Sequence, residues 1–519
     1  MNRSFSYLKL LLLAAALFYL VFILRTSFRF QGTLYFTLID DAMVSMRYAQ
    51  HVAQGFGAVW NIGEKPVEGF TNPGWMFFMS FLHLFVLPAS KISLGVMSTS
   101  AIILLANACV VYRICEVLQP GSKYAPLIAA GITAFYFPLV FWSLRGMEVG
   151  LLSLLIDLAT LVALRFIDSG RQRFILLLSL LFFTALVVRM DALIQIFIII
   201  LYLISRTKFN LRSMALPLLI IGLTSFAILW IQHVYFGDFL PNTYYQKIAG
   251  ASAWERIKNG LLVFNQHASR DILVLALIAL AGVILYKDMQ NRETLLLAGL
   301  LLVQCAYSIW VGGDYAEVEV DAANRFITQG MPALIILFSL VAGRILEDLM
   351  IVRLPMIQSK LVIQSVISSG VALSVLLVIS GQPWISWAID NAPLLKADMR
   401  RVKIGLALGE YTSPQATIAV HAAGQIPYFS ERRTIDLLGL NDPVIAKGPV
   451  TGPFYPGHDK WNYGYSILQL KPDLIADNWV KLGDFMRDRS EYQQLDNGMY
   501  LRKDSTLIDI NGLLKNSPN

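Results

Sequence analysis

Residues 37–75 read TLIDDAMVSMRYAQHVAQGFGAVWNIGEKPVEGFTNPGW, and they directly follow an apolar N-terminal stretch. Two adjacent carboxylates, Asp40 and Asp41, stand at the start of a short helix predicted over residues 41–54. Aspartate is favoured there because its side chain can cap free backbone N–H groups and because the helix dipole attracts negative charge. One aspartate is enough for a cap, so a second role for the pair stays open beside the capping interpretation.

Composition places this segment in a membrane protein. The chain has 519 residues, of which 56% are hydrophobic and 15% charged, whereas soluble domains average about one-quarter charged residues. Apolar runs predict membrane spans at residues 8–24, 95–115, 125–141, 150–165, 174–188, 192–205, 214–234, 271–286, 294–310, 327–342 and 361–380. The expected fold class is a polytopic α-helical membrane protein with about 11 transmembrane helices, of which the first is a retained anchor.

Basic residues predict the orientation of these spans. Lys and Arg gather in alternate loops, including residues 113–123, 165–173 and 287–292, and such loops normally face the cytoplasm. The alternation requires that residues 75–87, which are too short to cross a bilayer, form an interfacial or re-entrant helix on the outer face. Residues 26–94 are then a first periplasmic loop, and we expect a multi-pass protein of the bacterial inner (plasma) membrane.

The composition changes after residue 381, where the long apolar runs stop. Residues 416–429 and 472–477 have strand-like patterns, and the Asn-Gly pair at 497–498 predicts a hairpin turn. The chain therefore divides into a transmembrane domain at 1–381 and a C-terminal soluble α/β domain at 382–519. Three cysteines lie without disulfide or metal-ligand spacing, and the net charge of +7 lies mostly in the cytoplasmic loops, so no nucleic-acid partner is expected.

The charged residues that suggest chemistry fall on the predicted outer side, and ionisable groups near a membrane are usually functional. The carboxylates are Asp40, Asp41, Glu68, Glu148, Asp191 and Asp314, and the cations are Arg47, Arg189, Lys247 and Arg325. The cations suit a phosphate, and a carboxylate suits the role of base toward a hydroxyl group. Structural interpretations stay open: Arg189 and Asp191 as an ion pair, Glu148 as a helix cap, and the Gly-Gly-Asp-Tyr segment at 312–315 as a turn.

The segment DDAMVSMRYAQHVAQGFGAVWNIGEKPVEGFTNP resembles the first outer loop of the mycobacterial terminal β-(1→2)-arabinofuranosyltransferases and their bacterial relatives. These are GT-C glycosyltransferases that use decaprenyl-phosphoryl arabinofuranose. Further similar segments follow in the same order: RGMEVGL at 145–151, RMDA at 189–192, YFGDFLPNTYYQK at 235–247, VGGDY at 311–315, NRF at 324–326, IDLLGLNDP at 435–443 and PGHDK at 456–460.

The resemblance implies that residues 1–381 are a GT-C catalytic domain. It implies transfer of a sugar, arabinofuranose in these relatives, from a polyprenyl-phosphate donor to a hydroxyl of a cell-envelope glycan, with inversion. Asp40 or Asp41 would take the hydroxyl proton, and we favour Asp40. Asn72, Asn242, Tyr245 and His458 join the charged residues as candidates for binding donor or acceptor.

The expected partners are the lipid-linked sugar donor, a glycan or glycoprotein acceptor, and membrane lipids. Arg and Lys are expected to stabilise the leaving phosphate, with a divalent cation (Mg²⁺ or Mn²⁺) as the alternative although the sequence shows no ligand set. The C-terminal domain is expected to bind the acceptor through three polar loops and the aromatic residues beside them. These are residues 421–425, 439–442 and 456–460, with Tyr428, Tyr455, Trp461 and Tyr463.

Three other functions stay open. An enzyme of the same type could modify a protein or a lipid, such as pilin or lipopolysaccharide. A transporter or flippase for a lipid-linked sugar would predict charged residues at mid-membrane and inverted repeats, and the sequence shows neither. A sugar-binding receptor with an inactive site is the third.

Overall fold

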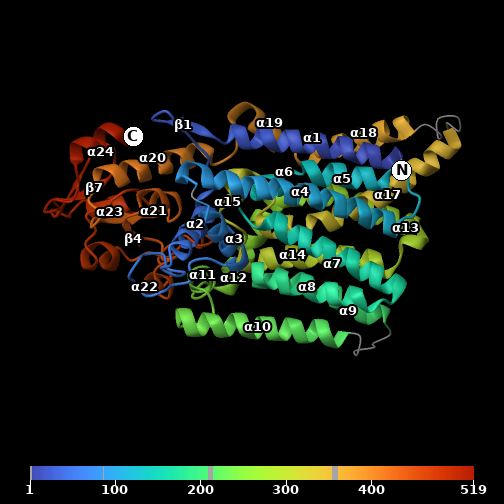
Figure 1. The fold of residues 1–519 in the computed structure, drawn as a ribbon, viewed down its shortest axis with the longest axis horizontal. Helices are drawn as coiled ribbons and strands as arrows, with labels where there is room; N and C mark the ends of the chain where they lie inside the picture. Colours follow the sequence, from blue (N-terminus) through green and yellow to red (C-terminus); the bar gives the residue numbers. More distant parts are fainter. Residues whose placement is uncertain (1–2, 86, 208–213, 354–360, 519) are drawn as a thin grey trace. The chain divides into compact units, whose positions relative to one another are not determined.

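A computed structural model of the chain describes residues 3–85, 87–207, 214–353 and 361–518. The chain packs as two compact units (Figure 1). The helical unit comprises Met1–Arg25, Met97–Ala227 and Ile257–Ala392. The loop–sheet unit comprises Thr26–Val96, Ile228–Arg256 and Pro393–Asn519.

The helical unit is a bundle in which α5 packs against α17 and α18, and α7 packs against α8 (Figure 1). Its helices are α1 (Arg3–Arg25), α5 (Ala125–Phe135), α6 (Phe137–Leu144), α7 (Val149–Ser169), α8 (Gln172–Val188), η1 (Met190–Ala192), α9 (Leu193–Arg206), η3 (Phe264–Ala268), α13 (Ser269–Leu285), η4 (Lys287–Met289), α14 (Arg292–Val311), α15 (Ala316–Val320), α16 (Arg325–Thr328), α17 (Met331–Arg353), α18 (Leu361–Ile379) and α19 (Gly381–Asp390). Three more helices have residues in both units: α4 (Ala89–Leu118), α10 (Ala215–Phe236) and α12 (Ala253–Val263). Every predicted span overlaps these helices, the span at 125–141 overlapping α5 and α6 and the span at 327–342 overlapping α16 and α17.

The helices differ in how well they suit a bilayer. Among the described residues, seven are long and apolar enough to cross it, or eight if the bent pair α5–α6 is one span. The short spans expected at 174–188 and 192–205 are α8 and α9, with 17 and 14 residues. The remaining predicted span is α17, which carries Arg344, Glu347 and Asp348 toward its C-terminal end.

The span predicted at 125–141 is broken. Helices α5 and α6 meet at Tyr136, whose backbone is extended, and their axes differ by 47°. Pro138 in the first turn of α6 has no N–H to donate, and its ring would clash with a helical carbonyl four residues earlier. The proline therefore ends one helix and begins the next.

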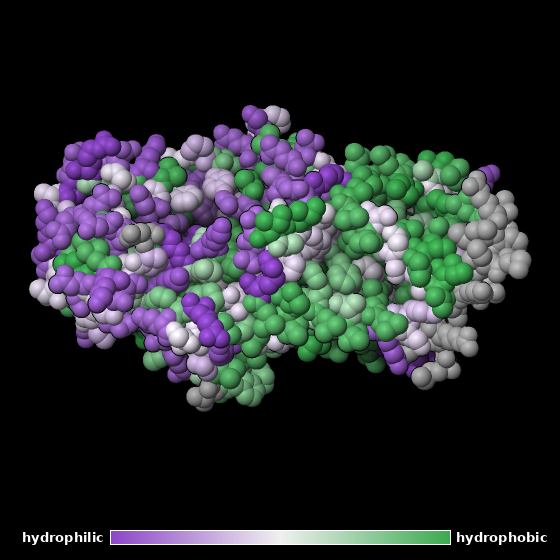
Figure 2. All heavy atoms as spheres, turned by 90° about the horizontal axis from the view of Figure 1, so that it is seen from above, coloured by the Kyte–Doolittle hydropathy of each residue, from purple (hydrophilic) through white to green (hydrophobic). Residues whose placement is uncertain are grey.

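Apolar side chains cover much of the face of the helical unit that Figure 2 shows. Leu10, Leu13 and Leu17 of α1 are 61%, 57% and 56% exposed, and Leu219 and Leu223 of α10 are both 56% exposed. A continuous surface of this kind is stable against lipid and not against water. The chain is a multi-pass membrane protein.

The loop–sheet unit combines segments from distant parts of the sequence. Its elements are β1 (Phe28–Phe30), β2 (Thr33–Tyr35), α2 (Asp40–Ala53), α3 (Pro73–His83), α11 (Asn242–Lys247), α20 (Leu395–Tyr411), β3 (Thr417–Val420), α21 (Gln425–Ser430), β4 (Arg433–Asp436), α22 (Pro443–Ala446), η5 (Gly464–Gln469), β5 (Leu474–Ile475), α23 (Leu482–Met486), β6 (Tyr492–Gln494), β7 (Tyr500–Arg502) and α24 (Ile510–Asn516). Helix α3, in the segment expected to be interfacial, has 11 residues and is about 17 Å long, which is too short to span a bilayer.

Five strands form one sheet in the order β4-β3-β5-β7-β6. Strand β3 is parallel to both β4 and β5, while β7 is antiparallel to β5 and β6. Gly498, with φ of 82°, lies in the predicted hairpin turn between β6 and β7. Because β3 comes first and lies between its parallel partners, the chain leaves β3 and β5 toward opposite sides. Such a switch point is where open α/β sheets usually bind ligands.

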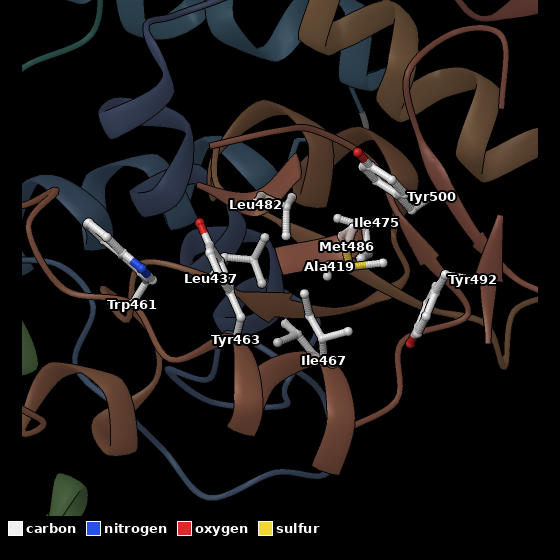
Figure 3. Close-up of a cluster of buried hydrophobic side chains, with 11 residues drawn as sticks. Ala419, Leu437, Trp461, Tyr463, Ile467, Ile475, Leu482, Met486, Tyr492 and Tyr500 are labelled. Carbon is white, nitrogen blue, oxygen red and sulfur yellow. The ribbon is translucent and has the colours of Figure 1, made fainter. Parts of the chain in front are cut away.

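The sheet packs against a cluster of eleven buried side chains (Figure 3). Trp461 and Tyr463 belong to it, with 9% and 5% exposed, and their rings stack with centroids 6.3 Å apart. Tyr428 is only 2% exposed. The expectation that these three aromatic residues form a sugar-binding surface is therefore wrong, because their rings fill the core. Tyr455 is half-buried.

Candidate functional site

The acidic pair lies in the first turn of α2, but neither residue caps the helix. The N-cap is Ile39, which makes no side-chain cap hydrogen bond. Instead, the carboxylate of Asp40 accepts hydrogen bonds from two backbone N–H groups of the turn after β3. These bonds come from Gly424, at 3.2 Å, and from Gln425, at 2.9 Å. Asp40 thus joins the first loop to the sheet.

The approach of these two segments leaves no room for a side chain at position 424. A Cβ on Gly424 would lie 2.0 Å from the carbonyl oxygen of Asp40. The side chain of Gln425 adds hydrogen bonds to the carbonyl of Leu38 and to Asp398, at 3.0 and 2.7 Å. Burial raises the pKa of Asp40 to about 6, although the charge of Arg401 and the N–H of Gln425 act in the opposite direction.

Asp41 and two further candidates influence one another electrostatically. Burial lowers the pKa of His458 to about 4, while its bond to the Pro456 carbonyl and the charge of Asp41 partly offset the effect and Lys247 adds to it. The ring of His458 donates through Nδ1 to that carbonyl, at 2.9 Å. A Cβ on Gly457 would lie 3.1 Å from Cε of Lys247. The loop at 456–460 therefore lies against Lys247, and the charge of Asp41 acts on His458.

A histidine–aspartate pair marks the switch point of the sheet. His421 directly follows β3 and Asp477 lies two residues after β5, and Nδ1 of His421 is 2.9 Å from an oxygen of Asp477. Asp477 also accepts from the N–H groups of His421 and Ala422, at 2.7 and 3.2 Å. Burial alone would raise the pKa of Asp477, yet His421 and the N–H groups hold it below its usual range.

Trp479 links this pair to His458. Its ring lies 5.2 Å from that of His421, in a stacked arrangement, and 5.3 Å from that of His458. Sequence reasoning missed Asp477 and Trp479. The pattern at 472–477 predicts a strand, but only the pairing of that strand with β3 shows that its end meets the polar loop at 421–425.

Several predicted site residues fasten the loop–sheet unit together. Arg47 is 3% exposed and its guanidinium donates to the Trp60 carbonyl at 2.6 Å, to the Arg432 carbonyl at 2.8 Å and to the Pro427 carbonyl. Asn72 accepts a hydrogen bond from the hydroxyl of Ser45, at 2.9 Å. The polar groups of Arg47 and Asn72 thus make hydrogen bonds within the loop–sheet unit.

The motifs that supply Asn242 and Tyr245 are also joined within this unit. Asn242 donates to the carbonyls of Gly439 and Leu440, each at 2.9 Å. The carbonyl of Tyr245 accepts from Lys460, at 2.8 Å, and the ring of Tyr245 lies 4.8 Å from the ammonium of Lys447. The segments at 235–247, 435–443 and 456–460 therefore depend on one another for their conformation.

Glu68 is a buried carboxyl group in the same unit. It is 4% exposed, and one of its oxygens accepts from Gln232 at 3.2 Å. The other oxygen is buried without a hydrogen-bond partner among the described residues. Burial raises the pKa of Glu68 to about 7, against the effect of the Gln232 hydrogen bond.

The remaining candidates form a second cluster, in the helical unit. Arg189 contacts Glu148 at 2.6 Å and Asp191 at 2.5 Å, and Arg325 contacts Asp314 at 2.8 Å. The ring of Phe326 lies 5.6 Å from one guanidinium carbon and 5.5 Å from the other. Three carboxylates thus face two guanidinium groups, so the cluster carries no surplus of positive charge.

The described residues contain no group of three or more His, Cys, Asp or Glu side chains arranged to hold a metal ion.

The family described as Domain of unknown function (DUF8728) matches residues 392–503, which include the sheet. A search of curated proteins finds no match. Among solved structures, ArnT from Cupriavidus metallidurans bound to undecaprenyl phosphate is similar, with a TM-score of 0.51 and 13% identity over 82% of this chain and 85% of that chain. The Archaeoglobus fulgidus oligosaccharyltransferase tethered with an acceptor peptide has a TM-score of 0.51 and 11% identity, over 84% of this chain and 64% of that chain.

At these identities the likeness concerns the fold. Both solved structures are GT-C membrane proteins. The chain therefore has the GT-C fold, an α-helical membrane bundle, with a small sheet domain at its C-terminus.

Proposed function

We propose that this protein is a membrane glycosyltransferase that transfers a sugar from a polyprenyl-phosphate donor to a hydroxyl group of a cell-envelope glycan. One observation carries the proposal: an acidic pair in the first loop of a GT-C chain adjoins the switch point of a sheet, together with His421 and His458. A carboxylate and imidazoles at a ligand-binding edge suit proton transfer from a hydroxyl.

The donor is a polyprenyl-phosphate sugar, and the sugar is arabinofuranose. The similarity of residues 40–73 to the first loop of arabinofuranosyltransferases supports this choice. The solved structure of ArnT, bound to undecaprenyl phosphate, supports a lipid of this class for the fold.

Asp41 is the base in this proposal. Its charge acts on His458 in the loop at 456–460, whereas Asp40 binds the turn after β3. Asp41 takes the proton of the acceptor hydroxyl while the oxygen bonds to the anomeric carbon and the bond from that carbon to the phosphate oxygen breaks. The electron pair leaves with the phosphate, which needs no proton, and the configuration inverts.

Lys247 is the proposed partner of the donor phosphate. Its charge acts on His458, as that of Asp41 does, so it belongs to the same cluster. Arg189 and Arg325 pair with carboxylates instead, and a phosphate there would meet a cluster that is negative overall. Replacing Lys247 by Met is therefore expected to weaken donor binding more than replacing either arginine.

The proposed orientation places the loop–sheet unit in the periplasm. We propose that residues 1–381 form the transmembrane domain and that residues 382–519 form a domain that binds the acceptor. The alternation of basic loops in the sequence supports it.

The deciding experiment incubates the purified full chain with radiolabelled decaprenyl-phosphoryl arabinofuranose and a soluble arabinofuranose hexasaccharide. Transfer of label to the hexasaccharide supports the proposal, and Asp41→Asn should abolish it. A second incubation replaces the hexasaccharide with a peptide, because the related oligosaccharyltransferase holds an acceptor peptide. Label on the peptide alone would shift the acceptor class to protein. Movement of the donor across a vesicle membrane without transfer would point to a flippase.

A further inference from the structure

His421, the residue after β3, has an oriented imidazole ring that is partly exposed to solvent. Nδ1 of His421 lies 2.9 Å from a carboxylate oxygen of Asp477, and the side chain is 16% exposed. Stacking on Trp479 fixes the plane of the ring. The opposite edge of the ring carries Nε2, the second polar atom of the imidazole.

A polar atom of the stacked indole ring has no partner among the described residues. Nε1 of Trp479 is buried without a hydrogen-bond acceptor among the described residues. An indole N–H can only donate, and a buried donor without a partner is unfavourable unless a ligand or water satisfies it. Nε2 of His421 can accept or donate a hydrogen bond, and Nε1 of Trp479, on the stacked ring, can donate one.

We infer that His421, oriented by Asp477, and Trp479 bind a hydroxyl of the carbohydrate acceptor at the switch point, beside the acidic pair. This inference rests on the proposed function and names where the acceptor is held. A hydroxyl suits both atoms, since it can accept from the indole N–H and can donate to or accept from Nε2 in either state of the imidazole. Asp477 acts through His421 and is a positioning residue.

The location agrees with the geometry of the sheet. The turn that starts at His421 continues to Gly424 and Gln425, which bind Asp40. An acceptor held by His421 therefore lies at one end of the turn whose other end binds Asp40. Ligands of parallel sheets bind at this kind of strand end.

The test compares two substitutions that remove different nitrogens of the imidazole. In His421→Asn, the amide nitrogen replaces Nδ1 and keeps the bond to Asp477, but Nε2 is lost. In His421→Gln, a polar group remains near the position of Nε2. Trp479→Phe keeps an aromatic ring and removes the N–H. His267→Asn is the matched control, because His267 also pairs with an aspartate, Asp321, at 3.2 Å.

Binding of three hexasaccharides to the full chain in detergent is measured by titration calorimetry, using arabinofuranose, galactofuranose and mannose probes. The inference predicts that His421→Asn and Trp479→Phe each weaken binding of the best probe by roughly tenfold, as the loss of one hydrogen bond does. His421→Gln should retain most of the affinity, and His267→Asn should match wild type. In transfer assays, His421→Asn should raise the acceptor KM by roughly tenfold and leave donor binding unchanged.

The outcomes separate this inference from the proposed function. Hexasaccharide binding that depends on His421 without any sugar transfer would support the inference and refute the proposed activity. Transfer by wild type with an unchanged acceptor KM in His421→Asn would refute the inference alone. Absence of binding of all three probes to wild type would refute it as well.

Discussion

Two adjacent carboxylates in the first turn of α2 have different surroundings. The oxygens of Asp40 accept hydrogen bonds from two N–H groups of the turn after β3. The residues that donate, Gly424 and Gln425, are 384 and 385 positions away in the sequence. The charge of Asp41 acts to raise the pKa of His458, which lies in the loop at 456–460. We infer that the first aspartate is structural and the second chemical, which reverses the preference drawn from the sequence.

Substituting each aspartate by asparagine tests this division. Asp41→Asn should reduce turnover by about 100-fold or more, as loss of a general base typically does. Asp40→Asn keeps an oxygen that can accept from Gly424 and Gln425, and it should cost less than tenfold. Initial rates with labelled donor measure both. A larger loss in Asp40→Asn than in Asp41→Asn would return the role of base to Asp40.

Glu68 predicts a pH dependence of stability. Burial raises the pKa of Glu68 in the folded chain to about 7. The stability that the protonated carboxyl group contributes to folding is therefore fully present below the pKa of the unfolded chain and is lost as pH rises through 7. Wild type should therefore lose stability between pH 5 and 8, and Glu68→Gln should lose up to about 3 kcal/mol less over that range. Thermal unfolding in detergent at several pH values gives the comparison. Parallel pH profiles for the two proteins would contradict the assignment.

At the scale of elements, the turn between β3 and α21 organises the site. It carries His421 at one end, and its N–H groups bind Asp40 at the other. The turn can come this close to α2 because residue 424 has no side chain.

Gly424→Ala should separate α2 from the sheet. The new Cβ would meet the Asp40 carbonyl oxygen at 2.0 Å, a contact that backbone atoms must move to relieve. We expect a loss of about 1–3 kcal/mol in stability together with a loss of transfer activity. Gly483→Ala is the control, because the nearest atom to its Cβ is a tyrosine hydroxyl at 3.8 Å. Unfolding temperatures of the two variants that fall equally would show that the contact is not specific.

The sequence predicts these elements unevenly, and the reasons are physical. Membrane helices follow from apolar runs because lipid requires both apolar side chains and internal backbone hydrogen bonding. Strands such as β3 and β5 follow from local patterns, but the order in which they pair depends on long-range packing. That order decides that His421 meets Asp477. Likewise, the sequence places Trp461 beside a polar loop, while only the packing of the core shows that its ring points inward.

At the scale of the whole molecule, the surfaces of the two units suit different surroundings. The helical unit displays leucines toward lipid, while hydrophilic residues cover much of the loop–sheet unit (Figure 2). Every segment of the loop–sheet unit must then emerge on the same side of the membrane, although its segments are separated by many helices.

Cysteine labelling tests this requirement. In a background without Cys109, Cys115 and Cys305, single cysteines at the exposed positions Gln54 and Lys503 should react with a membrane-impermeant reagent added to intact cells. A cysteine at Asp288, in a predicted cytoplasmic loop, should react only after permeabilisation. Labelling of Gln54→Cys and Lys503→Cys from opposite sides would contradict the predicted topology.

The hydrogen bond between Asp40 and Gly424 also constrains how the protein is made. Its two residues are 384 positions apart, and at about 5–20 residues per second a ribosome needs roughly 20–75 seconds to synthesise the chain between them. During that interval the helices can enter the bilayer one after another, while the first loop lacks its binding partner. A nascent chain that stops before β3 would carry its membrane helices yet never form the contact between Asp40 and the turn.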